Sequence, residues 1–269
     1  MTGEPVKKAV QKGLNNILSK NQNIVDLLMG RENVQVVDTE ELIQQVQTRV
    51  WGALKKDFQY SNVTKDSEEF LKQNILQSVP MEVLYVDLVG STKMVLELPQ
   101  TQLAAIISSF AQEMAYVIKQ HHGYILKFVG DAVIGYFVEK EGMRIADSAV
   151  SCAESMIKVL KMGINPILEQ YDYPDLQIKI GIDRGVNTVI QYGNGEDSHV
   201  DLLGPCMNMA AKIQSKAYPD QILIGEDVYN RLDTSIQEYF EKIVWKDKEW
   251  HYTNKMTGQI YSVYAYIGK

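Results

Sequence analysis

Two apolar, β-branched runs, each carrying one isolated aspartate at a break that contains glycine, constrain the fold of this chain most. The first, residues 82–92, delivers Asp87, and the second, residues 124–137, delivers Asp131. A carboxylate at the end of a buried strand is unfavourable unless a cation or hydrogen bonds compensate its charge. Two such carboxylates on one sheet predict a divalent-metal site, and a metal beside a glycine-containing turn predicts phosphate chemistry.

Each aspartate also has a purely structural interpretation. Taken alone, Asp87 fits a helix N-cap and Asp131 fits an ordinary turn residue. The two occurring together, each at the end of an apolar strand, favour the metal site. If a helix begins after Asp87, its first backbone N–H groups, near Gly90, Ser91 and Thr92, can hold phosphate oxygens.

Composition narrows the class of protein. A chain of 269 residues with 45% hydrophobic content supports a sizeable core, and a net charge of −7 argues against general nucleic-acid binding. Its two cysteines fit a reducing compartment and form no zinc pattern. No apolar run approaches the roughly 20 residues of a membrane helix, and no signal peptide is evident. We therefore expect a cytoplasmic protein, without a membrane partner, whose metal is a hard ion held by oxygen.

The hydrophobic pattern changes near residue 80. Residues 1–80 predict short helices with one apolar stripe each, and helices of this kind usually pack on a partner domain or across a dimer. The stripes comprise Val6, Val10, Leu14, Ile17 and Leu18; Ile43, Val46, Val50 and Leu54; and Phe70, Leu71 and Ile75. We expect residues 1–80 to form a helical N-terminal extension for packing or dimerisation, with a sensory role as the alternative, and residues 81–269 to form the catalytic domain.

From Met81 onward, strands alternate with helices. The pattern predicts strands at 82–88, 124–129, 132–137, 176–183, 221–224, 240–245 and 260–266, and helices at 101–121, 142–162, 205–216 and 226–232. Helices interleaved with a mixed sheet predict an α+β fold, an α/β sandwich.

A second constellation follows Asp201 and Gly204. Asn208 and Lys212 are four residues apart in a predicted helix and so share one face. An amide and a cation side by side can bind ribose and phosphate, respectively. The alternative is a solvated helix face with a single lysine.

Four blocks of sequence together resemble one enzyme family. They are Val-Asp87-Leu-Val-Gly-Ser-Thr, Lys127-Phe-Val-Gly-Asp131, Gly181-Ile-Asp-Arg-Gly185 and Asp201…Gly204…Asn208…Lys212. These blocks occur in the same order in the class III nucleotidyl cyclases, which the chain resembles over residues 81–266. The resemblance implies a class III cyclase domain with a ferredoxin-like core, and phosphorus–oxygen lyase activity on a nucleoside triphosphate.

The resemblance also implies roles for individual residues. Asp87 and Asp131 correspond to the two metal aspartates, with the Leu88 carbonyl as a further ligand, for two Mn²⁺ or Mg²⁺ ions per site. Lys127 and Asp201 correspond to the pair that reads the base edge. The remaining positions are the ribose-orienting Asn208, the transition-state residue Lys212 and the base-pocket residue Tyr85.

The family's sites lie between two head-to-tail subunits, so the resemblance implies a homodimer with two equivalent sites. One subunit supplies the metal aspartates, and the other supplies the base-reading pair and the asparagine. The reaction it implies is two-metal catalysis, in which the ribose 3′-oxygen attacks the α-phosphorus and expels pyrophosphate.

Two positions depart from the family pattern. Lys212 stands where the family usually has arginine, and lysine lacks the planar fork that binds phosphoryl oxygens in a bidentate manner. Tyr85 stands where phenylalanine is frequent, so its hydroxyl either contacts a base or points into water. Because Lys127 and Asp201 suit both adenine and uracil, the base stays open between a pyrimidine and adenine.

The chain is similar to the solitary pyrimidine cyclases of bacterial antiphage (Pycsar) systems, which favours a cyclic UMP or cyclic CMP product. An adenylate cyclase that makes cyclic AMP from ATP is the alternative. A catalytically inactive cyclase-like regulatory module is the alternative of another class, which Lys212 favours. A diguanylate cyclase lacks support because the chain has no Gly-Gly-(Asp/Glu)-Glu-Phe loop.

Overall fold

The computed structural model describes residues 39–55, 62–193, 198–246, 249–254 and 257–268. In this part of the chain, eight strands form one mixed sheet in the order β2-β3-β1-β4-β6-β8-β7, and β5 pairs with β4 outside that path. The strands are β1 (Ser78–Leu88), β2 (Tyr124–Val129), β3 (Ala132–Val138), β4 (Ile178–Tyr192), β5 (His199–Leu203), β6 (Gln221–Gly225), β7 (Phe240–Lys242) and β8 (Val263–Tyr266).

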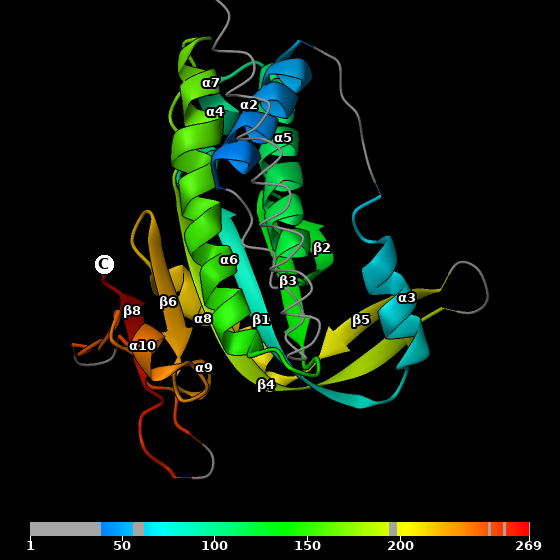
Figure 1. Cartoon of the computed structure of the whole chain (residues 1–269), viewed down its shortest axis with the longest axis vertical. Helices are drawn as coiled ribbons and strands as arrows, with labels where there is room; N and C mark the ends of the chain where they lie inside the picture. The colour runs from blue at the N-terminus through cyan, green and yellow to red at the C-terminus, as the bar shows by residue number, and fades with distance from the viewer. Residues whose placement is uncertain (1–38, 56–61, 194–197, 247–248, 255–256, 269) are drawn as a thin grey trace, which may run out of the picture. The chain divides into compact units, whose positions relative to one another are not determined.

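Helices cover this sheet and connect its strands (Figure 1). They are α2 (Thr39–Leu54), α3 (Lys65–Gln73), α4 (Ser91–Glu97), α5 (Gln100–Gln120), α6 (Ile145–Val159), the π-helical turn η1 (Leu160–Ile164), α7 (Asn165–Glu169), α8 (Pro205–Lys216), α9 (Glu226–Tyr229) and α10 (Thr234–Gln237). The mixed sheet with its helices confirms the α+β fold expected from the sequence.

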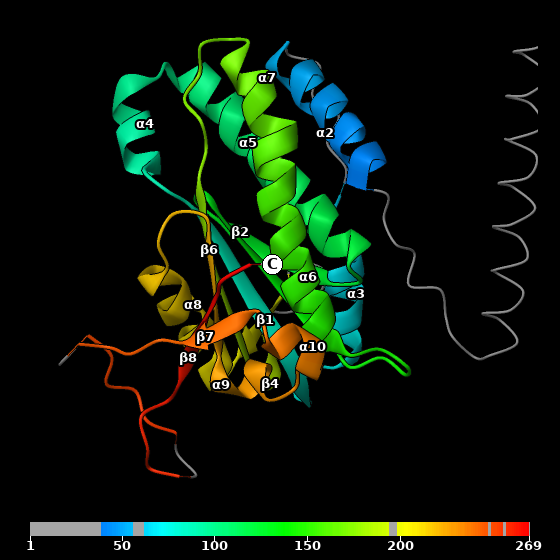
Figure 2. The same ribbon diagram turned by 60° about the vertical axis from the view of Figure 1, so that its left-hand side comes forward.

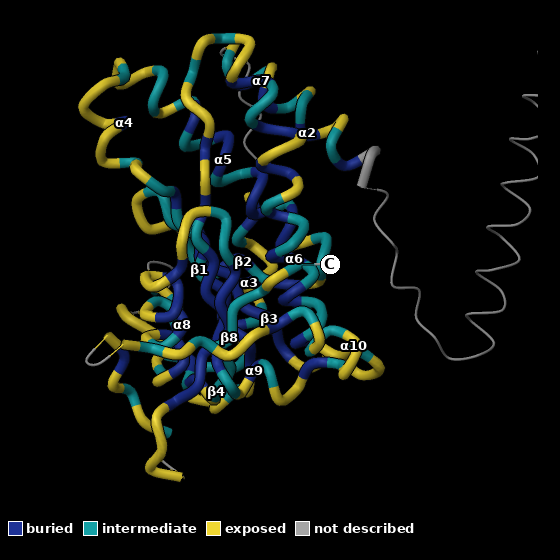
Figure 3. The backbone as a smooth tube through the Cα atoms, turned by 90° about the vertical axis from the view of Figure 1, so that its left-hand side faces the viewer, coloured by how far each residue is buried: buried dark blue, intermediate teal, exposed yellow. Residues whose placement is uncertain are grey.

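The central strand β1 is antiparallel to both of its neighbours, β3 and β4. Its side chains alternate between a face that contacts α6 and a face that contacts α8. Figure 3 shows that the strands at the centre of the molecule are buried, whereas the outer helix α4 is largely exposed. Tyr85 and Asp87 are two residues apart on β1 and therefore project from the same face of the sheet.

Helix α8 packs unusually close to the sheet, and Gly181 permits this contact. A Cβ atom at position 181 would lie 2.3 Å from the backbone nitrogen of Gln214 and 2.6 Å from the carbonyl oxygen of Ala210. Any larger residue would push α8 away from β4. The glycine therefore fixes the position of the helix that carries Asn208 and Lys212.

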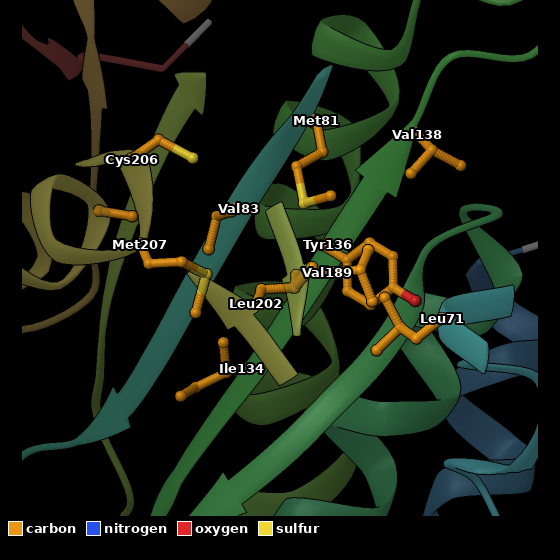
Figure 4. Packing of buried hydrophobic residues seen from close by; sticks show 11 residues of the cluster. Leu71, Met81, Val83, Ile134, Tyr136, Val138, Val189, Leu202, Cys206 and Met207 are labelled. Carbon is orange, nitrogen blue, oxygen red and sulfur yellow. The ribbon is translucent and has the colours of Figure 1, made fainter. Parts of the chain in front are cut away.

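Helices α2 and α3, from the expected N-terminal extension, pack on the same unit as the sheet. Val46 and Val50 of α2 are buried in contact with α5 and η1, where Gly163 leaves room for the Val46 side chain. Leu71 of α3 joins the core cluster formed by β1, β3, β4, β5 and α8 (Figure 4). The predicted helix with its stripe over residues 6–18 lies outside the described residues, and the division at residue 80 stays a prediction.

Several predicted elements have different bounds in the structure. The predicted helix over 142–162 ends as α6 at Val159 and continues into the π-helical turn η1. Strand β4 runs on to Tyr192, well past the predicted end at 183, because its second half pairs with β5. The short strand β5 and the single-turn helix α10 were not predicted from the sequence pattern.

Candidate active site

The β2–β3 hairpin places Asp131 at its tip. Val129 pairs with Ala132, so the loop consists of Gly130 and Asp131 alone. Gly130 adopts φ +62°, a left-handed conformation that suits the first position of a two-residue hairpin turn. The turn thereby directs the Asp131 carboxylate beside the end of β1, where Asp87 lies.

Asp87 and Asp131 are close enough to influence each other electrostatically. Burial raises the pKa of the Asp87 carboxyl, and the negative charge of Asp131 raises this pKa further. One oxygen of Asp87 accepts a hydrogen bond of 3.3 Å from the Gln214 amide. The Oδ2 atom of Asp131 is buried and has no hydrogen-bond partner among the described residues.

This environment fits a hard divalent cation. Two mutually repelling, half-buried carboxylates are stabilised when a cation lies between them, and the orphaned Asp131 oxygen would gain a ligand bond. The described residues contain no group of three or more histidine, cysteine, aspartate or glutamate side chains that could hold a metal. Two carboxylates with a backbone carbonyl leave open positions for water and phosphate, an arrangement that suits Mg²⁺.

Lys127 and Asp201, which the resemblance predicts to read the base edge, form an ion pair within one chain. The Lys127 ammonium lies 2.5 Å from Oδ2 of Asp201, and the other oxygen of Asp201 accepts a 2.9 Å hydrogen bond from the Leu202 N–H. The side chains of Lys127 and Asp201 are 41% and 27% exposed, so both remain accessible to a ligand. A donor and an acceptor are thus held side by side at an open edge.

A β-bulge directs Lys127 toward this position. The pairing of β2 with β3 shifts between Ile125 and Lys127, so that Tyr124 and Lys127 lie on the same face despite their odd separation. Lys127 is paired with Ile134, which is paired with Tyr85. These three residues form one row across the sheet.

Tyr85 lies next to the base-reading pair. Burial raises the pKa of its phenol, and the negative charge of Asp201 adds to this effect. Strand pairing and the Lys127–Asp201 ion pair thus bring Tyr85, Lys127 and Asp201 to one region of the sheet, and their role in binding a base stays a prediction.

Asn208 and Lys212 lie on the exposed side of α8, four residues apart. The opposite side of this helix is buried and includes Gln214, whose amide contacts Asp87. Residues two apart on a helix do not face each other, so Lys212 points away from the aspartate pair of its own chain. The Lys212 ammonium lies 3.9 Å from the ring centroid of Tyr252.

Gly90 ends the loop after β1 and adopts φ +72°, and its carbonyl accepts hydrogen bonds from Lys93 and Met94 at 2.9 and 3.2 Å. Ser91 and Thr92 begin α4, as expected from the sequence. The structure thus provides the predicted helix start near Asp87.

The sequence reasoning missed two polar contacts near the site. Gln214 could have been noticed as a polar residue on the apolar side of α8. Asp183 belongs to the Gly181–Gly185 sequence block. It is 3% exposed and accepts a 2.6 Å hydrogen bond from the Tyr261 hydroxyl. Burial holds the pKa of Asp183 well above its usual range, and the charge of Asp227 adds to this effect.

No helix in the described ranges combines the length and apolar character needed to cross a membrane.

Comparisons with known proteins find several nucleotide cyclases. A cytidylate cyclase from Escherichia coli is 28% identical over 178 residues, which is 63% of this chain and 39% of that protein. A uridylate cyclase from Rhodovulum sp. (strain MB263) is 26% identical over 181 residues, which is 64% of this chain and 74% of that protein. The matches to cytidylate cyclases thus span well under half of those proteins' length.

A solved structure shares the fold. The crystal structure of the adenylyl cyclase CyaB from P. aeruginosa superposes with a TM-score of 0.60 at 24% sequence identity, over 72% of this chain and 96% of that one. Residues 75–257 match the family described as the adenylate and guanylate cyclase catalytic domain, and this match covers more than half of the chain. The chain belongs to the class III adenylate and guanylate cyclase catalytic domain family.

Proposed function

We propose that the chain is a nucleotide cyclase that converts a pyrimidine nucleoside triphosphate to a 3′,5′-cyclic nucleotide and pyrophosphate. The observation that carries this proposal is the donor–acceptor pair of Lys127 and Asp201. The Tyr85 phenol, whose pKa the charge of Asp201 raises, lies on β1 together with Asp87. In the head-to-tail dimer proposed below, Lys127 and Asp201 of one chain serve one site and Asp87 of the same chain serves the other, so each chain contributes to both sites.

The chemistry of the pair suits both pyrimidines. Uracil presents the acceptor O4 beside the donor N3–H, and cytosine presents the acceptor N3 beside its donor amine. Lys127 donates and Asp201 accepts in either case. Adenine offers a similar pattern, so we assign discrimination between the bases to the Tyr85 hydroxyl. The cytidylate and uridylate cyclases among the relatives favour a pyrimidine over adenine.

Members of this family use divalent metal ions, and Asp87, Asp131 and the Leu88 carbonyl would hold them here, as two Mg²⁺ or Mn²⁺ ions per site. When bound, such ions neutralise the triphosphate and make the ribose 3′-hydroxyl more acidic.

The chain's own side chains then position the reacting groups. The Asn208 amide orients the ribose, so that the 3′-oxygen attacks the α-phosphorus in line as pyrophosphate leaves. The Lys212 ammonium offsets charge on the α-phosphoryl oxygens. Backbone N–H groups near Gly90, Ser91 and Thr92 hold the remaining phosphate oxygens.

The proposed active unit is a head-to-tail homodimer with sites at the interface. Its support is the orientation of α8, whose exposed side carries Asn208 and Lys212 away from Asp87 of the same chain. A second chain is needed to bring these side chains to an aspartate pair.

The setting of the enzyme is also a proposal. Nucleoside triphosphates are abundant in the cytoplasm, where we place the reaction. A role in antiphage signalling is proposed only from the resemblance to the Pycsar pyrimidine cyclases. Residues 1–80 would serve as a helical extension of the catalytic domain at 81–269.

The test is to incubate the purified full-length protein with Mn²⁺ and, separately, ATP, GTP, CTP and UTP, and to identify products by mass. We expect cyclic UMP or cyclic CMP, and no product from Asp87→Ala. Cyclic AMP alone would overturn the pyrimidine assignment and leave a cyclase. The absence of any product would favour an inactive cyclase-like module.

A further inference from the structure

The segment between β7 and β8 places an aromatic cluster against α8. Trp250 is 5% exposed, stacks on Trp245 with ring centroids 5.3 Å apart, and donates a 2.8 Å hydrogen bond from its indole nitrogen to the Tyr261 carbonyl. The cluster packs on apolar residues of α8, including Ile213 and Ala217. Figure 2 shows this part of the chain beside α8.

Tyr252 is the member of this cluster that contacts Lys212. Its ring meets Trp250 edge-on with centroids 4.8 Å apart, and its carbonyl accepts a 2.8 Å hydrogen bond from the Tyr261 N–H. An isolated bridge between Thr253 and Ile260 closes the adjoining loop. The Tyr252 ring is therefore held from several sides, and the Lys212 ammonium lies 3.9 Å from its centroid.

The contact with Tyr252 restricts the position of the Lys212 ammonium, which a flexible lysine side chain does not fix by itself. An arginine would present a rigid planar fork, whereas lysine carries a point charge on a flexible stem with many rotamers. A cation within about 6 Å of an aromatic centroid is attracted to the ring face, which restricts where the ammonium lies. The restriction keeps the charge near the side of α8 that also carries Asn208.

We infer that Tyr252 is a positioning residue that holds the Lys212 ammonium for the reaction. The inference rests on the proposed cyclase function. It assigns the segment between β7 and β8 a part in the reaction: Tyr252 orients the cation by its ring face and touches no reacting atom.

The contact itself is tested without any turnover. In full-length protein labelled with ¹³C-lysine, the ε-methylene signal of Lys212, assigned with Lys212→Arg, is expected upfield of the other lysines because of the ring current. The shift should persist in Tyr252→Phe, which keeps the ring, and disappear in Tyr252→Leu. Tyr218→Leu, at a tyrosine that is 75% exposed, is the matched control and should leave the signal unchanged. An ε-methylene signal that does not respond to Tyr252→Leu would overturn the inference.

The effect on turnover is tested by a double-mutant cycle. We expect Tyr252→Leu to lower kcat about two- to fivefold, the range that a partly exposed cation–π contact provides, with KM nearly constant. Tyr252→Phe should retain kcat, and Tyr252→Leu should add no further loss in a Lys212→Met background. If Tyr252→Leu lowered kcat equally in the Lys212→Met background, Tyr252 would have a packing role alone. If Tyr252→Leu raised kcat, the ring would hold the Lys212 ammonium away from the substrate.

Failure of the two proposals can be distinguished. If the wild-type protein turns over none of the four triphosphates, the cyclase function and the positioning role both fall, although the ring-current shift can still report the contact. If turnover occurs but the shift is absent, only the role of Tyr252 falls.

Discussion

At the residue scale, Tyr85 carries a hydroxyl group that a phenylalanine at the same position would lack. Tyr85 projects from the same face of β1 as Asp87 and lies beside Asp201. Its phenol can exchange a hydrogen bond with a base or with Asp201, and a phenylalanine can do neither. The residue is therefore the position in the pocket where base preference is most open to change.

We predict that Tyr85→Phe alters the ranking of nucleotides. Losing one neutral hydrogen bond changes relative kcat/KM among UTP, CTP and ATP by about two- to tenfold. Competition assays with mixed triphosphates and mass detection measure the ranking directly. An unchanged ranking would remove Tyr85 from base recognition.

The buried Asp183 carboxyl is expected to make the stability of the fold depend on pH. Its folded-state pKa lies well above the usual value, mainly because of burial, so its ionised form weakens the folded state. This cost is absent while the group is protonated in both states, grows as pH rises above the ordinary aspartate pKa, and is complete above the folded-state pKa.

We therefore expect Asp183→Asn to raise Tm relative to wild type increasingly as the pH rises from 4 to 8, because an amide can still accept from Tyr261. Thermal unfolding across this pH range is the measurement. Asp175→Asn, at an exposed aspartate, should give a difference that does not depend on pH in this way. A constant difference for Asp183→Asn would contradict the prediction.

At the scale of elements, α3 contributes to the core although it precedes the residues that match the family. Its Leu71 is 2% exposed within the cluster that includes Val83 and Leu202, the neighbour of Asp201 (Figure 4). The ring of Phe70 stacks on Tyr124 with centroids 5.2 Å apart. The helix thus supports the strands that carry the base-reading pair.

We predict that Leu71→Ala lowers the free energy of unfolding by about 2–4 kcal/mol, through lost burial and the cavity left behind. Leu76→Ala is a close control, since Leu76 is the same residue type five positions later but is 78% exposed. Urea unfolding of both variants compares them. A similar small effect in the two variants would show that α3 contributes little to the fold.

The sequence was informative about elements whose pattern is local. The β2–β3 hairpin was predictable because Gly130 and Asp131 separate two apolar runs, and α8 was predictable from its helical periodicity. Strand β5 has only five residues and relies on its pairing with the second half of β4, which no local pattern reveals. The bulge before Lys127 is invisible for the same reason, since it exists only relative to β3.

Contacts between distant residues limited the prediction of the site. The sequence blocks pointed to Lys127 and Asp201, which form an ion pair in the structure, and Tyr85 was singled out separately as a departure from the family pattern. Tyr252 lies forty residues after Lys212, in an aromatic segment that the sequence alone does not connect to α8. The contact between Tyr252 and Lys212 becomes visible only in the folded structure.

At the scale of the whole molecule, the proposed dimer makes a prediction about mixed subunits. Asp131→Ala and Asn208→Ala should each abolish turnover, because each removes one group from both sites. In a mixture, a heterodimer would combine the two defects in one site and leave the other site intact.

Random reassociation of equal amounts should then restore about a quarter of wild-type activity. The measurement is turnover after co-refolding or co-expression of the two variants, with each variant alone as the control. No recovery in a mixture that forms heterodimers would mean that each site is built from a single chain.

Helix α8 has one further consequence in such a dimer. Its buried side touches Asp87 through Gln214, while its exposed side would serve the opposite site with Asn208 and Lys212. The same helix then borders both catalytic centres, so a shift of α8 on metal binding at one centre would change the other, and such coupling would be reciprocal. We expect Mn²⁺ to bind the dimer cooperatively in calorimetric titrations, and Gln214→Leu to return the two centres toward independence.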